Sequence, residues 1–441
     1  NKFRIINLMD VCSKIFSRIL TARSYQILDK HGTKYQFGAT PKVGCQDGNF
    51  TLKTLLHLRH QHDLESYVVF ADLVKAFDTS NHALILAILK KFGAPPKFCS
   101  AIKRLYSNLT VILKIGKEKA EINQGVGVRQ GDNLSPVIFL LIMAAFSEIL
   151  EAKWTQSNIS KAKFHRGDLS DNALLNAQLT GHSTKLTSDS IPFEIINILY
   201  LDNGSFIFIT RNDMVKGINI INDTFRDLGL EMHIGSGPTK SKTELMYFPT
   251  SSFFNHTASL LPSSNPNTTS LATQQNPEST HVDDDDDDEH ALSATCTNRQ
   301  SSTGKLTFSK MSQAQRETIY YNSELTRRIY LNDGTSYIDF VAHFKYLGTF
   351  ISFDLTDNYD IDHRISKASQ QMGQLKCFWD NPYTDLRTKH QIFLAIPANL
   401  LLWGCETWAL RQSHINKLNA FWHRNIRRIL KINIAQVRDD L

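Results

Sequence analysis

The spacing of apolar residues changes several times along the chain, and each change marks an expected element. Apolar side chains at three- and four-residue intervals predict helices over about 7–28 and 49–62. Runs of β-branched and aromatic residues predict strands at 67–70 and 195–200. The other expected elements are strands at 111–115, 121–123, 205–209 and 240–248, and helices at 81–93, 135–150 and 214–228. The pattern therefore predicts a protein of mixed helices and strands.

Two pairs of short strands predict tight hairpins. The first joins 195–200 to 205–209, and we expect its turn at Asp202-Asn203-Gly204 because Asn-Gly is a strong two-residue hairpin signal. The second hairpin is expected over 344–351. Beyond it, the chain is expected to be helical from 362 to 434.

One long polar segment interrupts this pattern. Residues 251–304 are rich in Ser, Thr, Asn, Gln and Pro and contain six consecutive aspartates that begin at Asp283. Such a composition buries too little apolar surface to offset the entropy of ordering. We expect a disordered acidic insertion, with the aspartate run solvated and not a calcium site.

Charge and cysteine content narrow the class of partner and compartment. The 441 residues carry a formal net charge of +6 although 283–289 supply seven negative charges, so the remainder is distinctly basic and suits a polyanion. The six cysteines form no Cys-x-x-Cys pair, which argues against a disulfide framework or zinc knuckle. The longest apolar run, 137–146, is too short to span a bilayer, so we expect a core helix and no membrane partner.

Two aspartates stand at the ends of predicted strands. Asp72 follows the strand at 67–70, and Asp202 follows the strand at 195–200. Two carboxylates brought together can hold a pair of Mg²⁺ ions about 3.5–4 Å apart, an arrangement used for phosphoryl and nucleotidyl transfer. A lone strand-end aspartate is more often a cap or turn residue, so the surrounding motifs decide between the two interpretations.

Three short motifs surround these aspartates. Lys-Ala-Phe-Asp occupies 75–78, Arg-Gln-Gly-Asp-Asn-Leu-Ser-Pro occupies 129–136, and a Tyr-x-Asp box begins at Tyr200. Together they resemble the motif series of reverse transcriptases, in particular those of LINE-type (non-LTR) retrotransposons. That family's box ends in a second aspartate, and here its last position is Asn203. The resemblance covers nearly all of the chain outside 251–304.

The resemblance implies a catalytic set. Asp72 and Asp202 are the expected Mg²⁺ ligands, and Asn203 occupies the position of the missing aspartate. Lys242 is expected near the triphosphate as a general acid, and Lys240 is the alternative. We expect two Mg²⁺ ions, with the second site weakened because Asn203 brings no charge.

Contacts to nucleotide and template are implied at a second set of residues. Phe77 is expected under the sugar of the incoming nucleotide, where its ring would exclude a 2′-hydroxyl, and the alternative is an ordinary core phenylalanine. Gly131 allows close backbone approach, and the following helix start favours a phosphate. The expected residues are Phe77, Arg129, Gln130, Gly131 and Tyr200.

Contacts to primer and hybrid are implied downstream. The hairpin at 344–352 resembles the element that grips the primer 3′ end, and 414–431 holds five basic residues and no acid. Such a helix can follow a phosphate backbone, and the alternative is a solvated basic face. The expected contact residues are Phe344, Tyr346, Leu347, Gly348, Arg424, Arg427, Arg428 and Lys431.

The resemblance implies an α+β fold, the right-hand polymerase, with fingers, a palm built on an antiparallel sheet and an α-helical thumb. The expected boundaries are fingers at 1–66 and 94–124, palm at 67–93, 125–250 and 305–355, and thumb at 356–441. The last palm segment includes the primer-grip hairpin.

The implied function is that of an RNA-directed DNA polymerase. Its expected partners are an RNA template, an RNA/DNA hybrid, a DNA primer and dNTPs, in the cytoplasm and nucleus. The alternative, from another class, is a catalytically inactive retrotransposon remnant that only binds nucleic acid. Because the chain starts at Asn1 inside an expected helix, we expect a fragment or a decayed gene copy.

Overall fold

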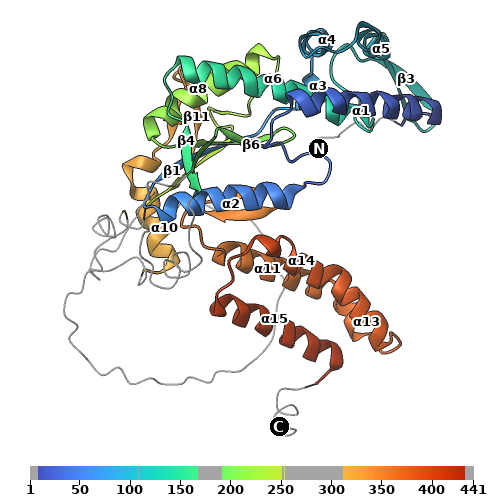
Figure 1. Cartoon of the computed structure of the whole chain (residues 1–441). Helices are drawn as coiled ribbons and strands as arrows, with labels where there is room; N and C mark the ends of the chain where they lie inside the picture. The colour runs from blue at the N-terminus through green and yellow to red at the C-terminus, as the bar shows by residue number, and fades with distance from the viewer. Residues whose placement is uncertain (1–7, 108, 167–190, 251–252, 254–310, 433–441) are drawn as a thin grey trace.

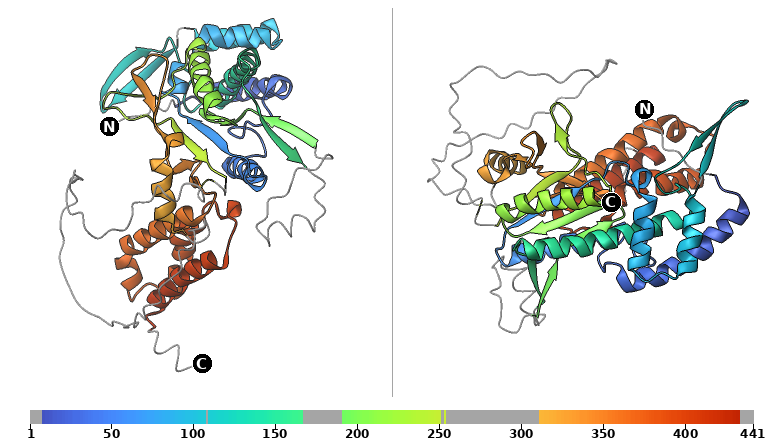
Figure 2. Two further views of the ribbon diagram at one scale, coloured as in Figure 1. Left: turned by 90° about the vertical axis from the view of Figure 1, so that its left-hand side faces the viewer. Right: turned by 90° about the horizontal axis from the view of Figure 1, so that it is seen from above.

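The computed structural model describes residues 8–107, 109–166, 191–250, 253 and 311–432. Within these ranges the chain forms a body of sheet and helices, followed by a group of helices at the C-terminal end (Figure 1). Two further views show the same division (Figure 2). The insertion predicted at 251–304 falls, apart from Phe253, outside the described residues.

A four-stranded antiparallel sheet lies at the centre of the body, in the order β6-β7-β1-β9. Every residue of β1 is buried, as expected of a strand covered on both faces. Figure 1 shows α6 and α8 on one side of the sheet and α2 on the other. The bounds are β1 Ser66–Ala71, β6 Asn197–Tyr200, β7 Asn203–Phe208, β9 Glu244–Phe248, α2 Cys45–Gln61, α6 Leu134–Gln156 and α8 Arg211–Asp227.

The apolar helix α6 lies in the middle of the core. Asp132 Oδ1 accepts a hydrogen bond from the Leu134 N–H at 3.1 Å and so fixes the helix start. Phe146 stacks on Phe225 of α8, with ring centres 4.0 Å apart. By length and composition alone α6 could cross a membrane, but 72% of its most apolar window is buried inside the protein. The expectation of a core helix is confirmed, and the helix continues past Leu150 to Gln156.

A group of helices and one hairpin, from the predicted fingers and from 67–93 of the predicted palm, lies beside the sheet (Figure 1). The Asn81 side chain caps α4 by accepting a hydrogen bond from the Ala83 N–H at 2.8 Å. Pro96 begins α5, because proline is tolerated at the first helical position. The bounds are α1 Val11–His31, α3 Ala76–Thr79, α4 His82–Lys91, α5 Pro96–Tyr106, β2 Thr110–Ile115 and β3 Glu118–Asn123.

One expectation about the second half of the body needs correction. The strand predicted at 195–200 is divided, because Ile195 ends β5 and Asn197 begins β6. Among the described residues after the polar segment, regular structure begins with α10, which Ser312 caps. The bounds are β4 Ala162–Arg166, β5 Ile191–Ile195, β8 Gly235–Ser236, α10 Gln313–Asn322, η3 Glu324–Thr326, β10 Ile329–Tyr330 and β11 Ser336–Ile338.

The hairpin predicted over 344–351 forms from β12 and β13, and the helical group follows it. This group has a small core of its own, made by Ala368, Met372, Trp379, Phe393, Ala398, Leu401, Phe421 and Ile429. The bounds are β12 His343–Tyr346, β13 Thr349–Ser352, α11 Asn358–Gln374, α12 Lys376–Asp380, α13 Leu386–Phe393, η4 Leu394–Ala398, α14 Asn399–Leu402, η5 Cys405–Thr407 and α15 Gln412–Leu430. The α+β fold class is confirmed, and the boundaries of fingers, palm and thumb stay predictions.

Candidate active site

Asp72 stands where β1 leaves the sheet. Its main-chain N–H donates to Thr243 Oγ1 at 3.2 Å, and its carbonyl accepts from the His233 N–H at 2.8 Å. The antiparallel register pairs Ala71 with Gly204, so the next position along both strands sets Asp72 opposite Asn203. The position that departs from the family motif is therefore the cross-strand neighbour of Asp72.

A cavity of about 200 Å³ opens at this strand end. It brings together the first carboxylate strand, the substituted position, the lysine predicted near the triphosphate and the predicted primer grip. Its lining residues are Phe70, Ala71, Asp72, Asn203, Gly204, Lys242, Phe344, Lys345 and Tyr346. Asp202 lies in the described part of the chain but does not line this cavity. The cavity thus unites segments that are distant in sequence.

The turn that carries Asp202 lies earlier than predicted. Tyr200 pairs with Asn203, so the two-residue turn is Leu201-Asp202 and not Asp202-Asn203-Gly204. Leu201 has φ +53, a left-handed conformation that an L residue adopts only at some cost. Asn203 opens β7, and its Nδ2 lies 3.4 Å from Asp202 Oδ1 as a hydrogen-bond donor.

Gly204 serves packing and not the turn. A Cβ atom built there would lie 2.8 Å from the ring of Phe206 and 3.3 Å from Leu199. The Asn-Gly pair therefore marks the hairpin but misplaces its turn, because the glycine makes room for an aromatic ring inside the strand.

Lys242 reaches the first carboxylate. Its Nζ lies 3.6 Å from Asp72 Oδ2, and its main-chain N–H donates to His233 Nδ1 at 3.3 Å. The two side chains are 60% and 30% exposed, so solvent screens the pair and its contribution to stability is small. Of the two candidate lysines, Lys242 is the one whose ammonium group lies beside Asp72.

The donor set at this strand edge is made of oxygen atoms. Asp72 and Asp202 offer carboxylates, and Asn203 offers an amide carbonyl. No group of three or more His, Cys, Asp or Glu side chains that could hold a metal occurs among the described residues. Mg²⁺ sites commonly use one or two protein carboxylates together with substrate phosphates, so the residues present fit this ion.

Phe77 lies at the edge of the core, in the short helix α3. Its ring is half-buried and stacks on Phe139 of α6, with ring centres 4.7 Å apart. Its carbonyl accepts a hydrogen bond from the Val128 N–H at 2.7 Å. The ring thus packs as a core residue would on one side, and its contact with a nucleotide stays a prediction.

The side chains of the Arg-Gln-Gly motif at 129–131 lie in two different surroundings. Gln130 Nε2 donates to Asp78 Oδ1 at 2.8 Å, and both residues line a second cavity, of about 350 Å³, together with Lys75. Gly131 has φ +102, which requires a glycine.

Arg129 turns away from that cavity. Its Nη2 donates to the Leu105 carbonyl at 2.6 Å, and its guanidinium lies 5.9 Å from the centre of the Tyr106 ring. The side chain thus supports the end of α5. The structure does not bring it together with the other nucleotide-binding candidates.

The predicted primer-grip hairpin packs against the carboxylate strands. Phe344 stacks on Phe70 of β1, with ring centres 4.1 Å apart. Ser205 Oγ of β7 donates to Tyr346 Oη at 3.4 Å, and burial raises the pKa of Tyr346 well above its ordinary value. Leu347 and Gly348 form the turn, with φ +46 and +94.

The basic residues of α15 are differently engaged. Arg424, Arg428 and Lys431 are exposed, whereas the Arg427 Nε donates to the His423 carbonyl at 3.3 Å. Lys417, which the sequence counts among the basic residues of this helix, pairs with Asp362 of α11 at 2.7 Å.

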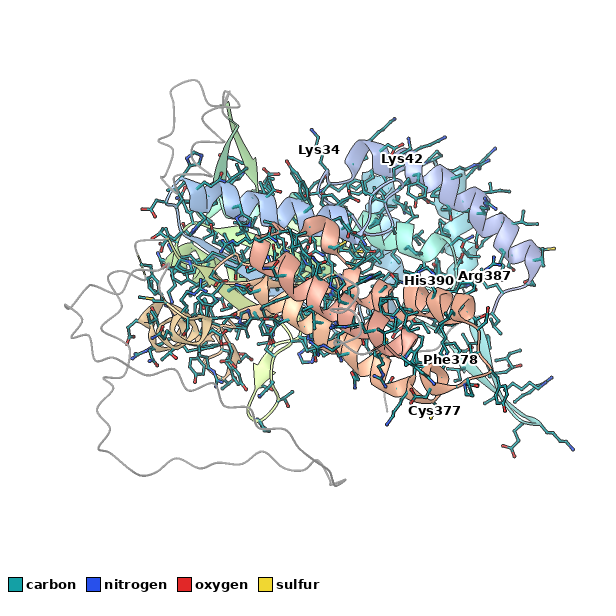
Figure 3. The ribbon with its side chains drawn as sticks, turned by 90° about the horizontal axis from the view of Figure 1, so that it is seen from below. Lys34, Lys42, Cys377, Phe378, Arg387 and His390 are labelled. Carbon is teal, nitrogen blue, oxygen red and sulfur yellow. The ribbon has the colours of Figure 1, made fainter. Side chains whose placement is uncertain are left out.

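Further exposed basic side chains lie elsewhere on the molecule. Figure 3 shows Lys34 and Lys42 of the α1–α2 connection on the same face as Arg387 and His390 of α13.

One contact of the turn was not predicted from the sequence. The side chain of Gln36, which lies between α1 and α2, accepts a hydrogen bond from the Leu201 N–H at 2.9 Å. A polar residue between Tyr35 and Phe37 was the only local signal, and it gave no partner.

Comparison with known proteins places these features in a family. Residues 1–247 match the family described as "Reverse transcriptase (RNA-dependent DNA polymerase)". The retrovirus-related Pol polyprotein from the type-2 retrotransposable element R2DM of Drosophila melanogaster is 32% identical over 142 residues, which are 32% of this chain and 13% of that protein. A type-1 element R2 polyprotein of Nasonia vitripennis is 30% identical over 146 residues, 32% of this chain and 14% of that protein. The matched segments thus span about an eighth of these relatives.

A solved structure of telomerase from Candida albicans, in complex with a fragment of telomeric RNA, aligns with 97% of this chain and 57% of its own. The identity is 9% and the TM-score 0.44. The family match covers more than half of the sequence and includes both carboxylate motifs. The chain therefore belongs to the reverse transcriptase (RNA-dependent DNA polymerase) family.

Proposed function

We propose that this protein copies RNA into DNA by Mg²⁺-dependent nucleotidyl transfer at the cavity beside Asp72. The observation that carries the proposal is the convergence of Asp72, Asn203, Lys242 and the β12–β13 hairpin on that cavity, in a chain of this family. When bound, Mg²⁺ supplies activation of the primer 3′-hydroxyl and neutralisation of charge on the departing pyrophosphate.

The chain's own residues hold and orient the reacting groups. Asp72 and Asp202 bind the metal through their carboxylates, and two main-chain hydrogen bonds keep Asp72 in place. Lys242 presents an ammonium group beside Asp72, where it can contact the triphosphate and give a proton to the leaving group.

Nucleic acid binds across several elements in this proposal. Phe344 and Tyr346 position the primer end, since both line the cavity. Gln130 and Lys75 line the neighbouring cavity, where template base and incoming dNTP meet. Arg424, Arg428 and Lys431 contact the backbone of the RNA/DNA hybrid, which is recognised mainly by shape and phosphate. The protein acts in the cytoplasm and nucleus, in target-primed copying of a retrotransposon RNA.

Asn203 weakens this activity. It offers a neutral carbonyl at the position opposite Asp72, so the site holds one negative charge fewer than the family motif supplies. Neutralisation of developing charge is the main catalytic device of phosphoryl transfer, and a lost ligand is therefore costly. We propose one well-held Mg²⁺ and a second that depends largely on the triphosphate.

The second candidate function is nucleic-acid binding without catalysis. It is favoured by Asn203, which brings no charge to the position where the family motif has a carboxylate. Primer extension on an RNA template, run beside filter binding of an RNA/DNA hybrid, separates the two candidates. Extension that Asp72→Asn abolishes supports the polymerase, and hybrid binding without extension selects the remnant.

A further inference from the structure

A segment far upstream pairs with the strand that leads to Asp202. Between α1 and α2, the chain runs parallel to β6: the Leu199 N–H donates to the Tyr35 carbonyl at 2.8 Å, and the Phe37 N–H donates to the Leu199 carbonyl at 2.9 Å. This pairing covers the outer edge of β6 and brings Gln36 to the turn that carries Asp202.

The side chain of Gln36 fixes the backbone of that turn. It is only 7% exposed, and its Oε1 accepts from the Leu201 N–H and from the Gly38 N–H, each at 2.9 Å. Two donors directed at one atom identify it as the oxygen of the amide. Leu201 directly precedes Asp202 and has φ +53, a strained conformation that persists only where its surroundings impose it.

Gly38 makes the close approach of this segment possible. A Cβ atom there would lie 2.5 Å from the Leu201 nitrogen and 3.0 Å from the Tyr200 carbonyl carbon. Both atoms belong to the backbone of the hairpin, which cannot rotate away as a side chain can. Gln36 and Gly38 therefore act on the same peptide unit, between Tyr200 and Leu201. Gln36 accepts the hydrogen bond of its N–H, and Gly38 leaves space for it because it has no Cβ atom.

We propose that Gln36 is a positioning residue for the polymerase reaction: it holds the Leu201-Asp202 turn so that the Asp202 carboxylate is directed to the metal site beside Asp72. The inference rests on the proposed function. Gln36 touches neither the metal nor the substrate in this proposal, because its hydrogen bonds end on the backbone. Its removal should disturb the turn and the metal site while leaving hybrid binding intact.

The test uses the full chain with Gln36→Leu, which removes the acceptor at similar volume. Gln61→Leu is the matched control, since Gln61 is an exposed residue at the end of α2. The first readout is hydrogen exchange in peptides spanning 197–206. The second is backbone cleavage near Asp72 and Asp202 by Fe²⁺ and ascorbate, in competition with Mg²⁺, which locates the bound ion without requiring activity.

We expect Gln36→Leu to speed exchange in that peptide and to weaken apparent metal affinity by about tenfold, the factor that one ordinary hydrogen bond represents. Hybrid affinity should stay within about twofold of the unchanged protein, and Gln61→Leu should alter nothing. Gly38→Ala should reproduce both effects by displacing Leu201, so the inference does not depend on a single variant.

Two outcomes overturn the inference. One is exchange in Gln36→Leu that equals that of Gln61→Leu, which would mean that the side chain does not hold the turn. The other is faster exchange with unchanged cleavage, which would mean that the turn does not position the metal ligand. A failure of the proposed function looks different, because Asp72→Asn would then leave the Fe²⁺ cleavage pattern unchanged.

Discussion

Two hairpins with two-residue turns meet beside Asp72, and the residues in those turns differ. In β12–β13 the turn residues Leu347 and Gly348 have φ +46 and +94, the conformation that two-residue hairpins favour. In β6–β7 the turn is Leu201-Asp202. Leu201 has φ +53, whereas the described residue Asp202 does not have a positive φ. Both turns begin with a leucine in a left-handed conformation, but the second turn residue is a glycine with positive φ in β12–β13 and Asp202 in β6–β7.

The two hairpins are also anchored to different parts of the molecule. The Leu201 N–H is held by Gln36, from the segment between α1 and α2. The carbonyl of Gly348 accepts a hydrogen bond from Arg364 of α11, and the Phe350 N–H donates to Asp360 of the same helix at 2.9 Å. The turn that carries Asp202 is thus held by the segment between α1 and α2, whereas the β12–β13 turn is held by α11. The same hairpin also packs on β1, because Phe344 stacks on Phe70.

The largest loss of stability at the contacts between the β12–β13 hairpin and α11 should come from a change at Asp360, which is fully buried. It accepts hydrogen bonds from the Phe350 N–H and from Trp408 Nε1 at 2.8 Å, and it lies 3.5 Å from Arg364 Nε. Asp360→Asn leaves the Arg364 charge buried without its partner, and we expect a loss of about 3–5 kcal/mol in the free energy of unfolding. Urea unfolding followed by tryptophan fluorescence measures it.

The matched control lies two residues further along α11. Asp362 pairs with Lys417 at 2.7 Å, but its side chain is half exposed. Asp362→Asn should cost less than about 1 kcal/mol, because solvent screens exposed pairs. Equal losses in the two variants would show that burial does not set the strength of this junction.

A second prediction concerns pH and the helix α2, which bears on the same junction through the buried pair Lys53–Asp357 at 2.7 Å. Burial lowers the pKa of His57 in α2 to about 4, and the nearby Asp357 only partly opposes this. The unfolded chain takes up the proton near its ordinary pKa of about 6.5, whereas the folded protein stays neutral there. Stability should therefore be full above about pH 6.5 and fall as the pH drops toward 4.

The expected loss over that window is about 3 kcal/mol, read from urea unfolding at a series of pH values. His57→Gln should flatten the slope in part, because burial also lowers the pKa of His60, His363 and His414. An unchanged slope in His57→Gln would assign the pH dependence to other groups.

A smaller effect is expected at Gly204, the glycine that lies in β7 and not in a turn. Gly204→Ala brings a Cβ atom to 2.8 Å from the Phe206 ring, and the ring can shift only in part. We expect a loss of about 1–2 kcal/mol in thermal or urea unfolding. Gly125→Ala is the control, because nothing lies within 4 Å of its Cβ position, and it should change stability by less than about 0.5 kcal/mol. Unchanged stability in Gly204→Ala would show that the ring of Phe206 does not require a glycine at this position.

Gly348 and Gly204 show what the sequence could predict and what it could not. Gly348 has the positive φ that a two-residue turn needs, so the β12–β13 hairpin could be predicted from local sequence. The apolar helix α6 and the strand before Asp72 could be predicted as well. Gly204 follows a packing need set by Phe206, which no local rule expresses. The Asn-Gly signal therefore found the second hairpin but not its turn.

Some candidate site residues could likewise be predicted from the sequence, and others could not. Motif spacing led to Asp72, Lys242 and Gln130, which line the two cavities. It did not lead to Gln36, whose partner is 165 residues away, or to the internal contact of Arg129 with Leu105. Such contacts depend on which segments the fold brings together, and the sequence alone does not give that information.

We expect full activity to need a carboxylate at the position opposite Asp72, where this chain has Asn203. Primer extension on an RNA template with Mg²⁺, comparing the unchanged protein with Asn203→Asp, measures this need. We expect weak or absent extension by the unchanged protein and a gain on the order of 10²-fold or more in Asn203→Asp, the scale of one electrostatic group in a transition state. Asp72→Asn should abolish the gain, and hybrid binding should be the same in all three. Full extension by the unchanged protein, with no gain from Asn203→Asp, would contradict the claim.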